Sequence, residues 1–324
     1  MAAKTQSEFK ENKAPREATG NTLAELGKEN NEIIVLDADV SSSTKSSLFA
    51  KQFPNRFFNM GVSEQDLMGT AAGLALAGKI PFACTFAMFG IGRAWEQIRN
   101  TICRDNLNVK ILLTHAGITV GEDGSSHQAL EDLAIARAIP RLTIICPSDA
   151  TSASKAVKEA IKHKGPVYLR LGRSAIPTIY EEQDQFKIGK ANTLKEGKDA
   201  YIIACGTMVA EAIKAADSIE KKGKNVGVID MHTVKPIDKN AIEKAAQTGA
   251  IITAEEGTII GGLGSAVAEV LSEKTNAKLS RIGTKDTFGE SGKPAELLKK
   301  YGLTAHNIEQ ETLTLIEKKE ENTK

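Results

Sequence analysis

The sequence lacks the features that mark several large classes of protein. Its longest runs of apolar residues and glycine, at 71–78 and 81–90, are far shorter than the ~20 residues of a membrane-spanning helix. Lys and Arg number 42 against 41 Asp and Glu, and this formal net charge of +1 is not the basic excess typical of nucleic-acid binding. The N-terminal residues contain no apolar segment typical of a secretory signal. We therefore expect a cytoplasmic protein with no membrane and no nucleic-acid partner.

Paired cysteines are missing as well. The four cysteines, Cys84, Cys103, Cys146 and Cys205, stand singly and form no C-x-x-C motif. Reduced thiols in the core are therefore expected rather than disulfides or a zinc site. The chain has 324 residues, about twice the length of a typical ~150-residue domain, which predicts two domains.

Short apolar segments alternate with amphipathic ones through the first half of the chain. The segments expected to form strands are 33–36, 57–60, 82–86, 109–114, 142–146 and 167–171. The segments expected to form helices are 21–28, 64–76, 92–103, 128–138 and 150–162. Most of the strand segments are apolar throughout, as strands covered on both faces are. Strands joined by helices in this way predict an α/β fold with a doubly wound, mostly parallel sheet.

The pattern is interrupted after Arg173 and then resumes. Residues 174–198 show no sustained periodicity and contain a charged cluster at 181–184, which predicts an interdomain linker that could include an edge hairpin. Further strands are expected at 201–204, 226–229, 251–253 and 279–282, with helices at 208–221, 240–247, 264–274, 295–300 and 308–318. We therefore predict a first domain at 1–180, a linker at 181–198 and a second, smaller α/β domain at 199–324.

The first candidate functional segment is residues 61–65, which follow an expected strand and begin an expected helix. Ligands of doubly wound sheets bind at the carboxyl ends of the strands, so side chains here are well placed for function. Glu64 would lie in the first helical turn, where backbone N–H groups and the helix dipole favour a carboxylate. A capping arrangement between Ser63 and Asp66 explains the same residues, and the sequence favours neither interpretation.

The second candidate segment is the polar, glycine-rich stretch at 114–128. It follows a strand and carries His115 and His127, two of the five histidines, together with the adjacent Glu122 and Asp123. A polar loop of this length inside an α/β domain is more often functional than idle. Its spacing matches neither a P-loop nor a metal-binding signature. Histidines beside a carboxylate suit hydrogen bonding to a polyol and proton transfer near neutral pH, with an Asp-Gly turn and a helix-capping serine as the lesser alternative.

Two further segments are less specific. Arg170 and Arg173 lie at the end of the expected strand at 167–171, where arginine suits phosphate recognition, and a surface ion pair explains them equally well. Residues 255–264 form a glycine-rich turn between a strand and a helix. Its spacing differs from G-x-G-x-x-G, so close backbone packing is the favoured reason for these glycines.

The segments at 61–65 and 114–128 resemble those of transketolase. The most specific element is GEDGSSHQ at 121–128, with His115 twelve residues before His127, and VSE at 62–64, TFAMF at 85–89 and RS at 173–174 support it. The resemblance covers nearly the whole chain and corresponds to the C-terminal subunit of a split transketolase, which holds the pyrimidine-binding and C-terminal domains. It implies a transferase of pentose phosphate metabolism that uses thiamine diphosphate to move a two-carbon ketol group from a ketose phosphate to an aldose phosphate.

The resemblance also implies roles for individual residues. Glu64 matches the glutamate that hydrogen-bonds the aminopyrimidine ring of the cofactor, Phe86 and Phe89 match aromatic residues packed against that ring, and Asp39 matches an aspartate near the cofactor. Arg16, Ser43, His115 and Arg173 match groups that hold the sugar phosphate, and Asp123 and His127 match residues that contact the substrate hydroxyls near the reacting carbons. Gly92 departs from the family, which often has a further aromatic residue there. Without the resemblance, Phe86 and Phe89 are best explained as sheet core.

One family motif does not occur in this sequence. The Gly-Asp-Gly that holds the cofactor's diphosphate and magnesium is absent, so we expect no metal ligands here and a partner subunit that holds Mg²⁺ within a heterotetramer. The rival enzymes are 1-deoxyxylulose-5-phosphate synthase and the β subunit of 2-oxo acid dehydrogenases, which share the fold and the cofactor. The loop at 121–128 with His115 favours transketolase. A non-catalytic assembly subunit is the remaining alternative, although it would need neither Glu64 nor this loop.

Overall fold

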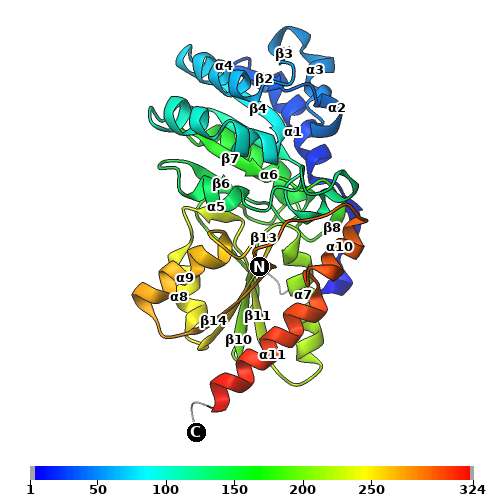
Figure 1. Cartoon of the computed structure of the whole chain (residues 1–324), viewed down its shortest axis with the longest axis vertical. Helices are drawn as coiled ribbons and strands as arrows, with labels where there is room; N and C mark the ends of the chain where they lie inside the picture. Colours follow the sequence, from blue (N-terminus) through cyan, green and yellow to red (C-terminus); the bar gives the residue numbers. More distant parts are fainter. Residues whose placement is uncertain (1–3, 322–324) are drawn as a thin grey trace.

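The computed structural model describes residues 4–321 and shows two α/β halves, one above the other in Figure 1. The upper half contains a seven-stranded sheet with the strand order β12-β6-β7-β5-β4-β2-β3. Its strands are β2 (Ile33–Asp37), β3 (Phe57–Asn59), β4 (Ile80–Phe86), β5 (Lys110–Thr114), β6 (Thr143–Ile145), β7 (Val167–Arg170) and β12 (Thr233–Lys235). Every neighbouring pair is parallel except β12 with β6. The predicted doubly wound, mostly parallel sheet is confirmed.

Helices cover both faces of this sheet, which explains why its strands are apolar throughout. On β2, Ile33 and Val35 pack into the core with α1 (Pro15–Glu29), α3 (Ser47–Gln52) and α6 (Ala150–Lys162). Ile34 and Leu36 pack into the opposite core with α4 (Glu64–Leu76), α5 (Asp132–Arg137) and the π-helix η4 (Gln97–Cys103). Successive side chains of a strand point to opposite faces, so both sets must be apolar.

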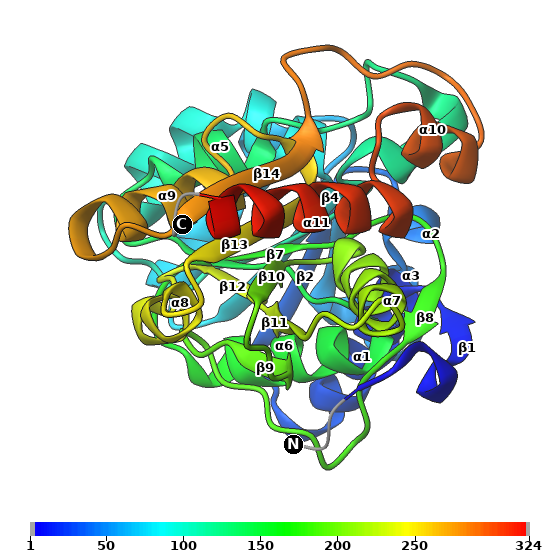
Figure 2. The ribbon, with the colours of Figure 1, turned by 90° about the horizontal axis from the view of Figure 1, so that it is seen from below.

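The lower half contains the second sheet, with the strand order β14-β13-β10-β11-β9. Its strands are β9 (Asn192–Lys195), β10 (Ala200–Ala204), β11 (Val226–Asp230), β13 (Ala250–Thr258) and β14 (Lys278–Thr284). Its helices are α7 (Met208–Glu220), α8 (Lys239–Ala246), α9 (Leu263–Lys274), α10 (Pro294–Lys300) and α11 (Ala305–Glu321). Helices α7 and α11 pack together on one face, and α8 and α9 pack together on the other (Figure 2). The second, smaller α/β domain is confirmed.

The two halves are connected by more than a linker. Strand β9 falls within the expected linker at 181–198, where it pairs antiparallel with β11 at the edge of the second sheet. Its short, polar sequence gave no strand signal because only its last two residues are buried. Strand β12 leaves the second half and joins β6 in the first sheet. A separate pair, β1 (Lys10–Lys13) with β8 (Ile176–Thr178), ties the N-terminal segment to the end of the first half. The domain boundaries themselves stay a prediction.

Three helices differ from the sequence-based expectation. Helix α1 begins at Pro15 rather than at 21, since proline is well tolerated at the first helical position. Helix α5 begins at Asp132 rather than at 128, because the residues before it bind the second half, where the Leu130 carbonyl accepts from the Thr258 N–H at 2.9 Å. The helix expected at 92–103 is two π-helices, η3 (Met88–Arg93) and η4. The remaining short elements are η1 (Gln6–Glu8), α2 (Ser41–Thr44), η2 (Pro54–Arg56) and η5 (Ile118–Asp123).

The structure also bears on the unpaired cysteines and on the lack of long apolar runs in the sequence. All four cysteines are buried free thiols, in agreement with the expected reduced thiols in the core. Across residues 4–321, no helix is both long enough and apolar enough to cross a membrane.

Candidate functional site

The carboxyl ends of four adjacent parallel strands bring together the residues that the sequence singled out. Strands β5, β4, β2 and β3 lie side by side in that order, so the segments that leave them emerge at one edge of the sheet. His115 follows β5, Phe86 ends β4, Asp39 follows β2, and Glu64 begins the helix after β3. This edge is where ligands bind in doubly wound folds.

Glu64 is a buried carboxylate at the first position of α4. Only 2% of its surface is exposed, and its Oε2 accepts a hydrogen bond from Arg93 Nη1 at 2.7 Å. The alternative of a capping arrangement at Ser63 is not realised, since the Ser63 hydroxyl donates to the Met60 carbonyl and caps no helical N–H. The position of Glu64 therefore serves a contact outside its own helix.

Two aromatic rings lie between Glu64 and the histidines. The Phe86 ring stacks on His115 with the ring centroids 3.9 Å apart, and Phe89 meets His127 edge-on at 5.1 Å. The Arg93 guanidinium lies over the Phe89 ring, 4.8 Å from its centroid, and so connects these rings to Glu64. Both phenylalanines are only partly buried, so they are not ordinary core residues.

A basic group surrounds His115. Arg16 Nη1 donates to the Ser43 carbonyl at 2.6 Å, while its buried Nε has no hydrogen-bond partner. Burial lowers the pKa of the Arg16 guanidinium, and the positive charge of Arg173 lowers it further. Arg173 Nη1 donates to the Val120 carbonyl at 2.5 Å and lies 3.1 Å from Glu122 Oε2. Two guanidinium groups that repel each other beside an unpartnered buried N–H are an arrangement that suits an anion.

His115 is held neutral within this group. Burial is the largest cause that lowers its pKa to about 3, and the positive charges of Arg16 and Arg173 add to it, followed by His127. Its backbone adopts a left-handed conformation with φ of 59°, and its Nδ1 lies 2.8 Å from the Thr114 hydroxyl. At neutral pH the ring can therefore donate one hydrogen bond and accept another without adding charge.

The glycine-rich loop at 117–128 carries the two remaining polar candidates. Asp123 is exposed at the end of η5, just before Gly124, which has a φ of 78° as in the Asp-Gly turn that was the lesser alternative for this segment. His127 is partly buried, and its Nδ1 lies 3.0 Å from the Ser126 hydroxyl.

Not every predicted residue joins these contacts. The Asp39 carboxylate accepts from Asn59 Nδ2 at 2.7 Å, so its hydrogen bond goes to the end of β3 rather than to the aromatic or basic residues. Ser43 contributes its carbonyl, through Arg16, rather than its hydroxyl. The site roles of all these residues stay predictions.

Arginines and glycines outside this group have structural roles. Arg170 forms a buried ion pair with Asp132, with Nε 2.6 Å from Oδ2, so it does not point toward a ligand. In the glycine-rich turn after β13, a Cβ at Gly262 would lie 2.0 Å from Glu255 Oε2, which agrees with close packing as the reason for these glycines.

The residues present fit one half of the cofactor that the resemblance implies. A buried carboxylate beside partly buried aromatic faces suits a flat, nitrogen-containing ring such as an aminopyrimidine. At Gly92, where the family often has an aromatic residue, a Cβ would find only Met88 Sδ within 4 Å, at 3.8 Å, so room remains there. The residues do not fit a divalent cation, because no three His, Cys, Asp or Glu side chains between 4 and 321 are grouped to hold one.

Sequence reasoning missed Arg93, the ion-pair partner of Glu64. The two lie 29 positions apart, and a single exposed arginine after Gly92 carries no periodic or motif signal. It also missed two contacts between this loop and the second half, from the Thr119 N–H to Glu256 and from the Gln128 amide to the Glu290 carbonyl. Glu256 lies in the segment at 255–264, for which the sequence analysis considered only the glycines.

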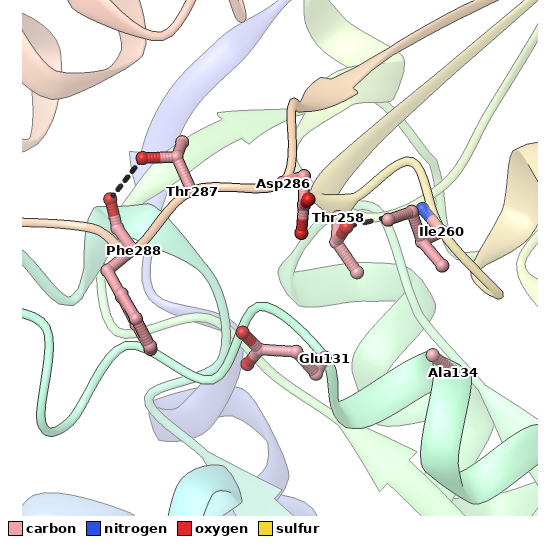
Figure 3. Close-up of a pocket in the computed structure, with 7 residues that line it drawn as sticks. All are labelled: Glu131, Ala134, Thr258, Ile260, Asp286, Thr287 and Phe288. Atoms are coloured by element: carbon pink, nitrogen blue, oxygen red, sulfur yellow. Dashed lines mark hydrogen bonds between the residues drawn. The ribbon is translucent and has the colours of Figure 1, made fainter.

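A pocket of about 300 Å³ lies elsewhere, on the seam between the two halves (Figure 3). Glu131 and Ala134 from the first half face Thr258, Ile260, Asp286, Thr287 and Phe288 from the second. None of the candidate site residues lines it.

Comparison with known proteins identifies the family. Residues 11–178 match the transketolase pyrimidine-binding domain, and residues 189–308 match the transketolase C-terminal domain. A protein of Methanocaldococcus jannaschii named as a transketolase C-terminal section is 50% identical over 91% of this chain and 94% of its own length. A 6-deoxy-6-sulfo-D-fructose transketolase subunit of Clostridium sp. is 41% identical over 90% of this chain and 91% of its own.

A solved structure points the same way. It is described as a split gene transketolase in an inactive beta4 tetramer, and it superposes with a TM-score of 0.87 and 53% identity over 93% of this chain and 99% of its own. Two family domains in the expected order, with relatives of nearly the same length, show that the chain belongs to the thiamine diphosphate-dependent transketolase family and corresponds to the C-terminal section of a split transketolase.

Proposed function

We propose that this chain is the C-terminal subunit of a split transketolase that transfers a two-carbon ketol group from a ketose phosphate to an aldose phosphate. The observation that carries the proposal is the row of contacts from buried Glu64, through Arg93 and the two phenylalanines, to the basic group at His115. One end suits the cofactor ring and the other suits a phosphate. An N-terminal subunit, in a cytoplasmic heterotetramer, would supply the diphosphate and Mg²⁺ site.

Each part of this row has a separate task in the proposed mechanism. Thiamine diphosphate, when bound, supplies the electron sink for breaking and forming the carbon–carbon bond. Glu64, whose Oε2 accepts from Arg93, would share a proton with the cofactor ring through its other carboxylate oxygen, Oε1, and Phe86 and Phe89 would pack against that ring. Asp123 and His127 would bind the sugar hydroxyls, and His127 and His115 are the candidate groups for moving a proton there. Asp39 orders the rim of the site beside β3.

The solved structure described as an inactive beta4 tetramer supports the need for a second kind of subunit. One relative is named for a 6-deoxy-6-sulfo-D-fructose substrate, and the basic group at Arg16 and Arg173 would suit a sulfonate as well as a phosphate. Two activity assays of the assembled enzyme test the proposal. One supplies xylulose 5-phosphate and ribose 5-phosphate, and the other supplies pyruvate with an aldehyde. Turnover of pyruvate with an aldehyde, without turnover of the two pentose phosphates, would favour the deoxyxylulose-phosphate synthase reaction instead.

Replacing Arg173 by Ala is expected to raise the KM of the assembled enzyme for phosphorylated sugars roughly 10- to 100-fold, the cost of losing a charge-assisted hydrogen bond. The change in kcat should be much smaller, because a phosphate contact persists throughout the reaction. Arg173→Lys, which keeps the charge, should give an intermediate KM.

Arg104→Ala is the matched control for this prediction. Its side chain is 72% exposed beside Asp105 and lies outside the site, so KM should not change. An unchanged KM for ribose 5-phosphate in Arg173→Ala would place Arg173 outside the phosphate site.

The depressed pKa of His115 predicts a pH-dependent stability of the isolated chain. The folded state keeps this ring neutral down to about pH 3, whereas the unfolded chain binds a proton below its ordinary pKa of 6.5. The stability contribution is therefore complete above pH 6.5 and is lost as the pH falls toward 3. Asn is the suitable replacement because it tolerates the left-handed backbone at this position.

Urea unfolding of the wild type and His115→Asn at several pH values measures this effect. Below pH 6.5, the wild type should lose about 1.4 kcal/mol of unfolding free energy per pH unit relative to the variant. Parallel stability curves for the two proteins would contradict the buried, neutral state of His115.

A further inference from the structure

The loop at 117–128, which carries Asp123 and His127, is held by the second half of the chain. Glu256 on β13 is only 2% exposed, and its Oε1 accepts from the Thr119 N–H at 2.6 Å. Its Oε2 accepts from the Thr207 hydroxyl at 2.5 Å. Both carboxylate oxygens are therefore occupied, and one of them fixes the backbone of the loop.

The loop approaches this carboxylate so closely that only glycine fits. Gly117 has a φ of +87°, and a Cβ there would lie 2.4 Å from Glu256 Oε1. On the other side, Arg170 Nη2 donates to the Glu256 carbonyl at 2.8 Å. Glu256 is thus held by the first half through its main chain and holds the first half's loop through its side chain.

The far end of the loop is fixed from the same half. Gln128 Nε2 donates to the Glu290 carbonyl at 2.9 Å and lies 3.2 Å from the Ile118 carbonyl at the loop's beginning. A Cβ at Gly289 would lie 1.8 Å from Gln128 Oε1, so this contact also depends on glycine. The loop is closed on itself and fastened at both ends to the second half.

The seam beyond the end of this loop contains a pocket. Glu131, three residues after Gln128, lines the pocket of about 300 Å³ whose other wall is the segment at 286–288 (Figure 3). The loop also packs against the second half, because Ile118 lies in a hydrophobic core cluster formed mainly by that half. Loss of the Glu256 side chain would still leave the Thr119 N–H without its hydrogen-bond acceptor.

We propose that Glu256 is a positioning residue for ketol transfer, which gives the second half of the chain a role in substrate binding. It holds the Thr119 segment so that Asp123 and His127 face the substrate hydroxyls. The proposal rests on the function proposed above. It assigns a specific task to a domain that otherwise has none in the reaction.

The neighbouring glutamate provides a matched control. Glu255 is also buried, at 1% exposure, but its oxygens accept from the Leu263 and Gly264 N–H groups at 2.7 and 2.8 Å. It caps the beginning of α9 and does not touch the loop, because adjacent residues of a strand point to opposite faces. Glu255→Gln should lower stability without affecting the loop.

Hydrogen–deuterium exchange of the full-length isolated chain tests the contact without any activity. In Glu256→Ala, amide exchange at 117–128 should become about 10- to 100-fold faster, as expected for the loss of a charge-assisted hydrogen bond. Glu256→Gln should rescue much of this, since the amide oxygen can accept from Thr119 and the amide nitrogen can donate to the Thr207 hydroxyl. Glu255→Gln should leave exchange at 117–128 unchanged.

Kinetics of the assembled enzyme test the positioning role. Glu256→Ala should lower kcat/KM for the sugar substrates by a similar factor while the dissociation constant for thiamine diphosphate stays the same. Unchanged exchange at 117–128, or unchanged kcat/KM, in a folded Glu256→Ala protein would overturn the proposal. Faster loop exchange together with no ketol transfer by the wild-type assembly would instead overturn the proposed function and leave the contact established.

Discussion

Replacing Glu64 by Gln is expected to lower kcat of the assembled enzyme by about 10²- to 10⁴-fold, the range for losing a proton-transfer group. Glutamine has the same shape, so the fold should be retained, but its amide cannot hold and release a proton as the buried carboxyl can. The loss should appear in kcat with every substrate, because the group acts on the cofactor ring rather than on the sugar. Steady-state kinetics and thermal unfolding of the same preparation measure both properties.

Arg93 offers a way to separate the carboxyl group from its ion pair. Arg93→Gln removes the ion pair between Arg93 Nη1 and Glu64 Oε2, which lie 2.7 Å apart, and keeps the carboxyl group of Glu64. If the proton at Glu64 matters, the Arg93 variant should lose far less activity than Glu64→Gln. Equal losses in the two variants, or near-normal kcat in a stable Glu64→Gln protein, would remove the proton-transfer role of Glu64.

The isolated chain is expected not to bind thiamine diphosphate with Mg²⁺ measurably. Mg²⁺ needs several oxygen ligands to neutralise a diphosphate, and residues 4–321 offer no such group of acidic side chains. The pyrimidine side alone, with Glu64, Phe86 and Phe89, supplies only part of the binding energy. Calorimetric titration of the cofactor into the chain should show negligible heat, and a clear binding isotherm should appear once the N-terminal subunit is present.

The parallel sheet and part of the site follow from the sequence for a simple physical reason. Strands buried on both faces are apolar throughout, so β2, β4 and β5 are visible as segments, and the residues that follow them must meet at one edge. Glu64 and His115 were predicted in this way, from local signals. Their roles came from the resemblance to the family rather than from spacing.

The remaining features depend on contacts between distant parts of the chain. Arg93 reaches Glu64 from a π-helix, and Glu256 reaches Thr119 from the other half, 137 positions away. Neither contact leaves a periodic pattern, because each is set by how the segments pack. Strand β12 was missed for the same reason, since its three residues gain a strand partner only in the sheet of the other half.

Titration of the purified N-terminal subunit into this chain tests the central claim most directly. With thiamine diphosphate, Mg²⁺, xylulose 5-phosphate and ribose 5-phosphate present, ketol transfer should be absent at first, rise with added partner and saturate at a fixed ratio of the two subunits. The partner alone should also be inactive. Ketol transfer by this chain alone, or none by the saturated mixture, would contradict the account of a split transketolase whose cofactor lies between two subunits.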